Sequence, residues 1–515
     1  MKFITTIISI VCTTSLVVAQ STTEAFEKYR GGHLTGTARY NGLSGAFGAL
    51  GGDLSALSDN PAGAAVFSSS HGAVTLSQGG SRFLTSYDGN SALKTDQANL
   101  NLNQIGGVLV FNKNTDTNTL ERVVLGFNYA LSQDHKSHYR LQGDLNTSIG
   151  SYFAEQANGY FPENISRFEG ETYRDAYINI GDSSGYGRRG QEAFFGYSSY
   201  LISPSEASDA IYDSELATTS SFQDIEVRQS GSNSKTSLNL AASYSSGWHF
   251  GANLNIHASS YQKEMVFYED NTYANVTYIQ DETTSSTGIS LGVGALYRTG
   301  KNFRFGLSYQ TPTWLSVNTE IDQRIITNFT TPIEIDDNQD GVVEDSFSSL
   351  TIDPGVYYLY SEYQLRIPSK TMLSAAYVIA DKALISGQYT YQNLSNIKYG
   401  EGFQGASQLN ESIAAYYKPI HDFRLGTEFR AQNWKFRAGT QFTSSPLESR
   451  VNSSSLDSGF SLGLGYAWKR YKLDLAYNHY QRTRNFTPFE NGSYFPTATI
   501  EEKGDLVSLT FNVGF

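Results

Sequence analysis

Apolar and polar residues alternate along the last strand that the sequence predicts, residues 502–515. Its apolar members are Val507, Leu509, Phe511, Val513 and Phe515, and the residues between them are small or polar. Because successive side chains of a strand point to opposite faces, one face suits lipid and the other suits water. An edge strand of a soluble sandwich shows the same alternation, but here the strand runs to a bare aromatic residue. The pattern therefore favours a membrane-spanning barrel strand.

Similar stretches follow one another from about residue 72, and the connections between them alternate in length. Short turns on one side and long loops on the other are typical of outer-membrane barrels. Tight links lie at residues 113–119, 245–247, 299–302, 380–382, 431–433 and 469–470, and long polar segments at 84–99, 133–232, 262–284, 318–355, 396–421, 444–457 and 483–501. The sequence thus predicts an all-β fold: a fourteen-stranded antiparallel transmembrane β-barrel over residues 72–515, with its longest extracellular loop at 133–232.

The tryptophans support this assignment, because indole side chains prefer the membrane interface. Trp248, Trp434 and Trp468 each adjoin a predicted tight turn, and Trp314 lies toward a long loop. Tryptophans of a soluble core would not need to gather at turns.

The first nineteen residues have the form of an export signal. Lys2 is followed by a mostly apolar stretch and by the small-residue site Val17-Val18-Ala19, which predicts a mature chain beginning at Gln20. The single cysteine, Cys12, lies within residues 1–19. No later run approaches the roughly 18 consecutive apolar residues of a membrane helix. We therefore expect export to the outer membrane of a Gram-negative bacterium and contact with its lipid.

Residues 20–71 precede the first strand and are rich in glycine and alanine. Leu43, Phe47, Leu50, Leu54 and Leu57 have a helix-like spacing. This spacing favours a compact hatch inside the lumen over the alternative, a disordered periplasmic tail.

Composition narrows the functional classes. The formal net charge of −13 argues against a nucleic-acid partner. The sequence contains no Gly-x-Ser-x-Gly motif and no compact set of Ser, His and acidic residues, so we expect no enzyme activity and no cofactor.

Residues 38–63, which end in Asn60-Pro61-Ala62-Gly63, resemble the N-terminal hatch of the FadL/TodX family of hydrophobic-compound transporters. Shorter pieces at 305–312, 365–370, 422–429, 436–439 and 473–477 are also similar to the family, and Phe515 resembles the signal that the barrel-assembly machinery binds. The resemblance implies a plugged fourteen-stranded barrel that passively transports long-chain fatty acids or other hydrophobic compounds. Ligand would be captured on outer loops, pass to a pocket above the hatch and leave sideways beside a kinked strand. Gly126 is a candidate for such a kink, with an ordinary small lumen residue as the alternative.

Within the longest loop, the most apolar stretch contains Phe194, Phe195, Tyr197 and Leu201. An exposed apolar patch is often a binding surface, which makes these residues candidates for ligand capture. A packing role that holds the loop over the barrel mouth is the alternative.

Arg424 and Arg437 face the lumen by alternation, together with other charged residues of the later strands. Such charges usually pair with one another or hold a plug, here through Asp53 and Asp59. The functional alternative is that one of the two arginines receives a ligand carboxylate.

Two features suggest metal or haem. Asp336, Asn338 and Asp340 resemble the start of a calcium loop, although Phe347 occupies the position of its last ligand. Histidines could serve haem, but His249 and His257 do not make a full ligand set.

Two alternatives to transport stay open. One is a haem-binding outer-membrane protein, and the other is a barrel of this kind that serves as a platform for protein secretion.

Overall fold

The computed structural model describes residues 28–29, 34–89, 93–112, 120–216, 221–300, 302–335, 343, 345–380, 382–403, 405–447, 456–489 and 495–515. Residues 1–19, assigned to the export signal, lie outside this part, as do residues 20–27 and 30–33 of the predicted hatch. No helix among the described residues is long and apolar enough to cross a membrane.

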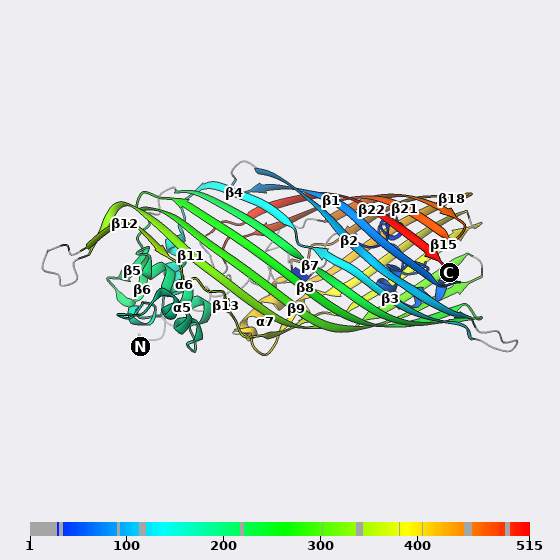
Figure 1. Cartoon of the computed structure of the whole chain (residues 1–515), viewed down its shortest axis with the longest axis horizontal. Coiled ribbons are helices and arrows are strands. Elements are labelled where there is room, and N and C mark those ends of the chain that lie inside the picture. The colour runs from blue at the N-terminus through cyan, green and yellow to red at the C-terminus, as the bar shows by residue number, and fades with distance from the viewer. Residues whose placement is uncertain are drawn as a thin grey trace, which may run out of the picture.

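The chain forms a closed antiparallel barrel of fourteen spans, which confirms the predicted fold (Figure 1). β1 pairs with β2 on one side and with β22 on the other, so the first and last strands close the barrel. The spans in chain order are β1 (His71–Ser86), β2 (Leu93–Asn112), β3 (Leu120–Asp134) with β4 (Ser137–Leu145), β7 (Ser221–Tyr244), β8 (Trp248–Asp270), β9 (Ala274–Thr299), β10 (Phe303–Gln310) with β11 (Thr313–Ile335), β12 (Asp345–Ile352) with β13 (Tyr358–Leu359), β14 (Tyr363–Ile367) and β15 (Lys370–Ile379), β16 (Ala383–Asn393), β18 (Pro419–Ala431), β19 (Trp434–Thr443), β20 (Asp457–Trp468), β21 (Tyr471–Phe486) and β22 (Ala498–Gly514).

Several spans run further from the tight turns than the sequence pattern predicts. β7 begins at residue 221 instead of 233, β8 ends at 270 instead of 261, and β11 ends at 335 instead of 317. The ladder between β8 and β9 continues to the pair Asp270–Asn275. These extensions are polar on the outside because water, not lipid, surrounds them. The alternation that marks a lipid-facing strand is therefore absent there.

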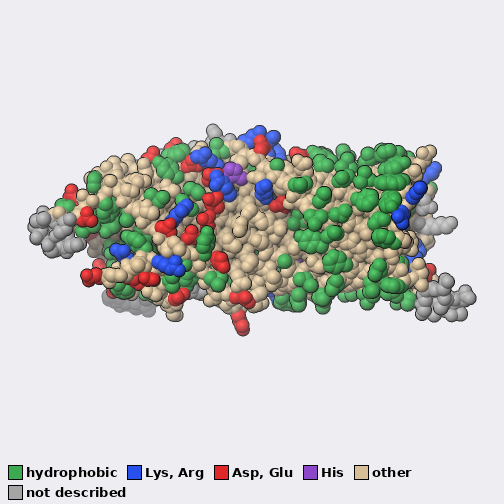
Figure 2. All heavy atoms as spheres, viewed as in Figure 1, with side chains coloured by type: hydrophobic (Ala, Val, Ile, Leu, Met, Phe, Trp, Pro, Cys, Tyr) green, Lys and Arg blue, Asp and Glu red, His purple; other side chains and the backbone are tan. Residues whose placement is uncertain are grey.

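Outward-facing apolar side chains form a band around the half of the barrel that carries the tight turns (Figure 2). We call that end the turn end and the opposite end the loop end. Trp248, Trp434 and Trp468 are exposed at the edge of the band beside the turns, and Trp314 is exposed opposite Ile289 near its other edge. Aromatic residues at both edges are typical of a membrane-embedded band. The band also includes Leu240, Phe250, Val293, Leu307, Leu373, Leu425, Leu462, Leu475 and Leu509.

The hatch, residues 34–70, fills the lumen at the level of this band. It contains α2 (Ala38–Asn41), α3 (Ala56–Asp59) and the 3-10 helix η1 (Pro61–Val66). Barrel side chains from many spans bond its backbone: the Ser308 hydroxyl donates to the Asp59 carbonyl at 2.6 Å, and the Gln388 side chain accepts from the Gly48 amide at 3.0 Å. These bonds satisfy backbone groups that a buried non-regular segment would otherwise leave unpaired.

A separate domain, the cap (residues 146–216), covers part of the loop end (Figure 1). Its aromatic core packs against Phe267 of β8, Tyr278 of β9 and Phe489. The cap is built from α4 (Ile149–Ala157), η2 (Pro162–Asn164), α5 (Tyr173–Asp182), α6 (Gly187–Ser198), β5 (Ile202–Ser205) and β6 (Ser208–Ser214). The remaining short elements are η3 (Leu394–Asn396), β17 (Lys398–Tyr399) and α7 (Ala406–Tyr416), which connect β16 to β18.

Candidate ligand pocket and exit

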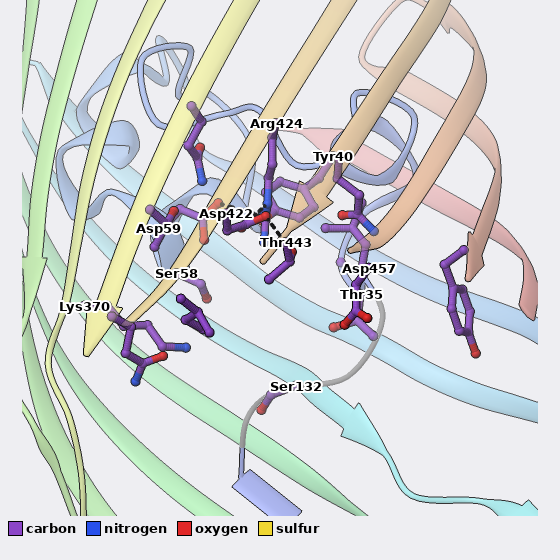
Figure 3. Close-up of a pocket in the computed structure, with 18 of the residues that line it drawn as sticks. Thr35, Tyr40, Ser58, Asp59, Ser132, Lys370, Asp422, Arg424, Thr443 and Asp457 are labelled. Atoms are coloured by element: carbon purple, nitrogen blue, oxygen red, sulfur yellow. Dashed lines mark hydrogen bonds and ion pairs between the residues drawn. The ribbon is translucent and has the colours of Figure 1, made fainter. Parts of the chain in front are cut away.

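A cavity of about 310 Å³ lies between the hatch and the loop-end half of the lumen (Figure 3). Its wall combines apolar and basic side chains that come from the hatch and from distant spans. The lining residues include Leu34, Leu131, Lys235, Lys370, Ile420 and Arg424. A cavity of this size, with an apolar wall and a few polar groups, is typical of a small-molecule site.

Arg424 borders the cavity but is already engaged. Its Nε donates to Asp422 at 2.8 Å, and its Nη1 donates to the Tyr40 hydroxyl at 2.9 Å. Tyr40 in turn donates to Asp59 at 2.7 Å, and the Nη1 atom of Arg424 lies 4.0 Å from the same carboxylate. Arg424 thus lies between the barrel and the hatch in the arrangement of a plug contact.

Arg437 lies deeper, beside the hatch, and its side chain is fully buried. It donates to Glu428 and to Asp474, each at 2.7 Å. Arg39 of the hatch reaches the same Glu428 at 3.4 Å. Two carboxylates neutralise this guanidinium, so the pair that a ligand carboxylate would need is already formed within the protein.

Two lysines of the cavity wall differ from these arginines. Lys235, on β7, donates to the Ser58 carbonyl at 3.3 Å. Lys370, at the start of β15, forms no hydrogen bond or ion pair with any described residue. Sequence reasoning missed both, although each has the alternation of a lumen-facing position. A half-buried ammonium without a carboxylate partner, beside an apolar wall, is suited to an anionic head group.

The barrel wall is interrupted beside this cavity. The backbone ladder between β2 and β3 ends at the pair Gln104–Ala130, and the register of β3 against β7 shifts between Leu131 and Gln133. We call the segments 99–103 and 131–134 the wall gap. Ala130, Leu131 and Ser132 line the cavity on its inner side.

Side chains replace the missing backbone pairs across the wall gap. The amides of Asn99 and Asn101 both donate to one oxygen of Asp134, and Lys136 donates to the Ala98 carbonyl at 3.0 Å. Leu100, next to them, is 74% exposed on the outside. The wall here can part by breaking side-chain bonds without opening a β-ladder.

The irregular site in β3 is not at Gly126, where both neighbouring ladders run without a shift. Gly126 faces the hatch instead: an added Cβ would lie 2.9 Å from the Leu57 side chain. It is therefore a small lumen residue, the alternative that the sequence left open.

The hatch motif packs against glycines of the wall. The Asn60 amide donates to the carbonyls of Gly48 and Ala295, and its oxygen accepts from the Ala62 amide at the start of η1. A Cβ added at Gly251 would lie 2.4 Å from the Pro61 carbonyl carbon. On the hatch side, the Gly63 carbonyl accepts from the Gly52 amide at 3.0 Å. The motif residues Asn60, Pro61, Ala62 and Gly63 are all buried and anchor the hatch.

The predicted capture residues lie inside the cap. Phe194, Phe195 and Leu201 are fully buried, and Tyr197 packs edge-on against Tyr212. Phe194, Phe195 and Leu201 fill the core of the cap and Tyr197 packs against it, which differs from the exposed patch that the capture hypothesis requires. The arrangement corresponds to the packing role.

Residues 336–342 lie outside the described residues, so the structure gives no view of Asp336, Asn338 and Asp340. Among the described residues, no three His, Cys, Asp or Glu side chains gather in a way that could hold a metal. His257 bonds to Ser290 at 2.9 Å.

Comparison with known proteins identifies the family. Residues 197–515 match the family described as "Outer membrane protein transport protein (OMPP1/FadL/TodX)", which is more than half of the chain. The protein belongs to this family of outer-membrane transport proteins for hydrophobic compounds, as the hatch motif predicted.

One solved structure supports the fold, and a second is reported beside it. A FadL homologue from Pseudomonas aeruginosa is 11% identical, with a TM-score of 0.55, and the match covers 94% of this chain and 100% of the other. The toluene transporter TodX from P. putida is 9% identical, with a TM-score of 0.47 and coverage of 94% and 99%. None of the curated protein sequences matches the chain.

Proposed function

We propose that the protein carries hydrophobic compounds with an acidic head group, most simply long-chain fatty acids, passively across the outer membrane. The head group binds at Lys370 and Lys235, the apolar chain lies along Leu34, Leu131 and Ile420, and the ligand leaves through the wall gap into the bilayer. The observation that carries the proposal is the position of Lys370: a cation with no partner among the described residues, in a cavity that adjoins the end of the ladder between β2 and β3.

Physical chemistry supports a sideways exit. Each CH₂ group left in water costs about 0.8 kcal/mol, so an aqueous route through the lumen disfavours a long chain. The hatch also fills the lumen below the cavity. A route from Leu131 on the cavity wall to Leu100 on the outer surface passes the polar side chains of the wall gap and reaches the bilayer without crossing the length of the lumen.

The test separates the head group from the chain. Lys370→Met keeps the length of the side chain but removes its charge. Because a hydrogen bond to a charged group contributes about 1.5–3 kcal/mol, we expect palmitate uptake at limiting concentration to fall by about tenfold or more. Hexadecane uptake should not change. The measurement is uptake of both radiolabelled compounds by cells whose own transporters are deleted.

Lys398→Met, at an exposed position of the loop end, is the matched control and should leave both rates unchanged. Equal loss of palmitate and hexadecane uptake in Lys370→Met would contradict a head-group role. Unchanged uptake of both would do the same.

A further inference from the structure

The turn end of the barrel is strongly basic in a chain that is acidic overall. Residues 112–122, 244–249, 298–304, 379–383, 430–435 and 468–472 contain eleven Lys and Arg residues against three Asp and Glu, whereas the whole chain has a net charge of −13. Basic side chains lie along the turn-end edge in Figure 2, and acidic ones gather toward the loop end. The two ends therefore differ in sign.

Three of these cations lie in the turns themselves. Lys382, Lys469 and Arg470 are exposed, and none of them forms an ion pair with a described residue. Arg430 is paired with Glu428 at 2.8 Å, which shows how an engaged member of this edge differs from the others.

Other cations of this end face the lumen instead. Arg298 is the cross-strand partner of Arg304, which donates to the Leu50 carbonyl of the hatch at 3.0 Å, and Lys435 is the partner of Arg430. Directly opposed residues of a sheet lie on the same face. The cations in the turns are therefore the ones that can meet an anion outside the barrel.

The height of these cations relative to the membrane identifies that anion. Trp434 begins strand β19, and in the neighbouring β20 Trp468 directly precedes the turn residues Lys469 and Arg470. The two tryptophans are 44% and 37% exposed on the lipid side. Outward aromatic side chains mark the interface of a bilayer, so cations just beyond them lie among the head groups. Tight turns face the periplasm in outer-membrane barrels, which places these cations at the inner leaflet.

We propose that this basic rim of the turn end (Lys382, Lys469 and Arg470) binds the phosphodiester groups of anionic phospholipids in the inner leaflet. Arg470 donates to the Tyr471 hydroxyl, so its guanidinium is held at the edge of the aromatic belt. The rim enriches phosphatidylglycerol-type lipids around the turn end and fixes the depth of the barrel in the membrane. A soluble acidic partner would need no aromatic belt at the same height.

Tryptophan quenching tests this proposal, because three of the four tryptophans lie at the rim. The full-length barrel is placed in nanodiscs of phosphatidylcholine with 20 mol% of either dibrominated phosphatidylglycerol or dibrominated phosphatidylcholine. Since each basic residue near the surface adds to the attraction of anionic lipid, we expect brominated phosphatidylglycerol to quench about twofold more strongly at low salt. The difference should vanish in 1 M NaCl.

The triple variant Lys382→Gln, Lys469→Gln and Arg470→Gln should lose the preference. The matched triple variant Lys94→Gln, Lys398→Gln and Lys503→Gln removes the same number of exposed charges at the loop end and should retain it. The shift of the folded barrel on unheated gels verifies that each variant is folded. Equal quenching by the two lipids in the wild type, or a preference that survives in the rim variant, would overturn the proposal.

Discussion

Arg437 and Lys370 are both cations of the lumen wall, yet their surroundings are opposite. Arg437, at the level of the hatch, lies between two carboxylates at 2.7 Å and is fully buried. Lys370, above the hatch, borders a cavity and has no partner among the described residues. A buried charge whose partners are present within the chain holds the structure together. A charge whose partner is missing is available for a ligand.

The role of the cavity beside Lys370 can be tested by closing the wall gap, its proposed exit. Cysteines at Asn101 and Asp134, whose present side chains meet at 2.6 Å, can be joined across the wall gap by a bis-methanethiosulfonate cross-linker. We expect the cross-linked variant to lose palmitate uptake entirely, because the two segments can no longer part, and dithiothreitol to restore it. Uptake assays before and after reduction measure this.

A second cysteine pair serves as the control for that experiment. Leu109 and Leu125 are opposite each other in the intact ladder between β2 and β3, and both face lipid. The same cross-link there should not slow uptake. Full uptake by the cross-linked Asn101–Asp134 variant would show that the ligand leaves by another route.

Substitution of a buried cation at the level of the hatch should lower the stability of the barrel. Arg437→Met leaves Glu428 and Asp474 with less compensation, and breaking a buried ion pair by removing one partner costs about 3–5 kcal/mol. We therefore expect the Arg437→Met barrel in lipid to unfold at a lower urea concentration, as measured by the shift of the folded barrel on unheated gels. Lys370→Met should not lower that concentration, since no internal partner is lost.

A partial rescue sharpens the same comparison. The triple variant Arg437→Met, Glu428→Gln and Asp474→Asn removes the orphaned charges and should recover part of the lost stability. If Arg437→Met and Lys370→Met destabilise the barrel equally, the distinction between the two levels fails.

The cap should show the most local effect. Phe195 is fully buried and contacts Tyr177 and Tyr278, so Phe195→Ser leaves a cavity and a hydroxyl in an aromatic core. Since truncation of a buried Phe costs about 3–5 kcal/mol locally, we expect rapid proteolysis within residues 146–216 while the barrel stays folded. Phe168→Ser, at a side chain 65% exposed, is the control and should remain resistant. A resistant Phe195→Ser variant would contradict a packing role.

The sequence predicted the barrel well because lipid-facing strands carry a strict alternation, as residues 507–515 illustrate. It underestimated β8 and β11 because their loop-end halves face water on the outside and lose the apolar member of that alternation. The hatch could be located from Asn60-Pro61-Ala62-Gly63, since a buried 3-10 turn against wall glycines restricts the residues it can contain.

The ligand site was harder to predict. Arg424 and Lys370 both have inward alternation, and only three-dimensional contacts reveal that the first is paired through Asp422 while the second is not. The wall gap depends on which backbone pairs are missing between β2 and β3, and side-chain patterns carry no information on that. Phe194 and Phe195 look alike in sequence whether they are exposed for capture or buried in a folded cap.

The most direct test of the account is the chemical identity of what the barrel carries. The detergent-purified protein is extracted with organic solvent, and the extract is analysed by mass spectrometry for wild type, Lys370→Met and Lys398→Met. We expect long-chain carboxylic acids in the wild type and in Lys398→Met, and their loss in Lys370→Met. Acids retained equally in Lys370→Met, or neutral hydrocarbons alone in the wild type, would contradict it.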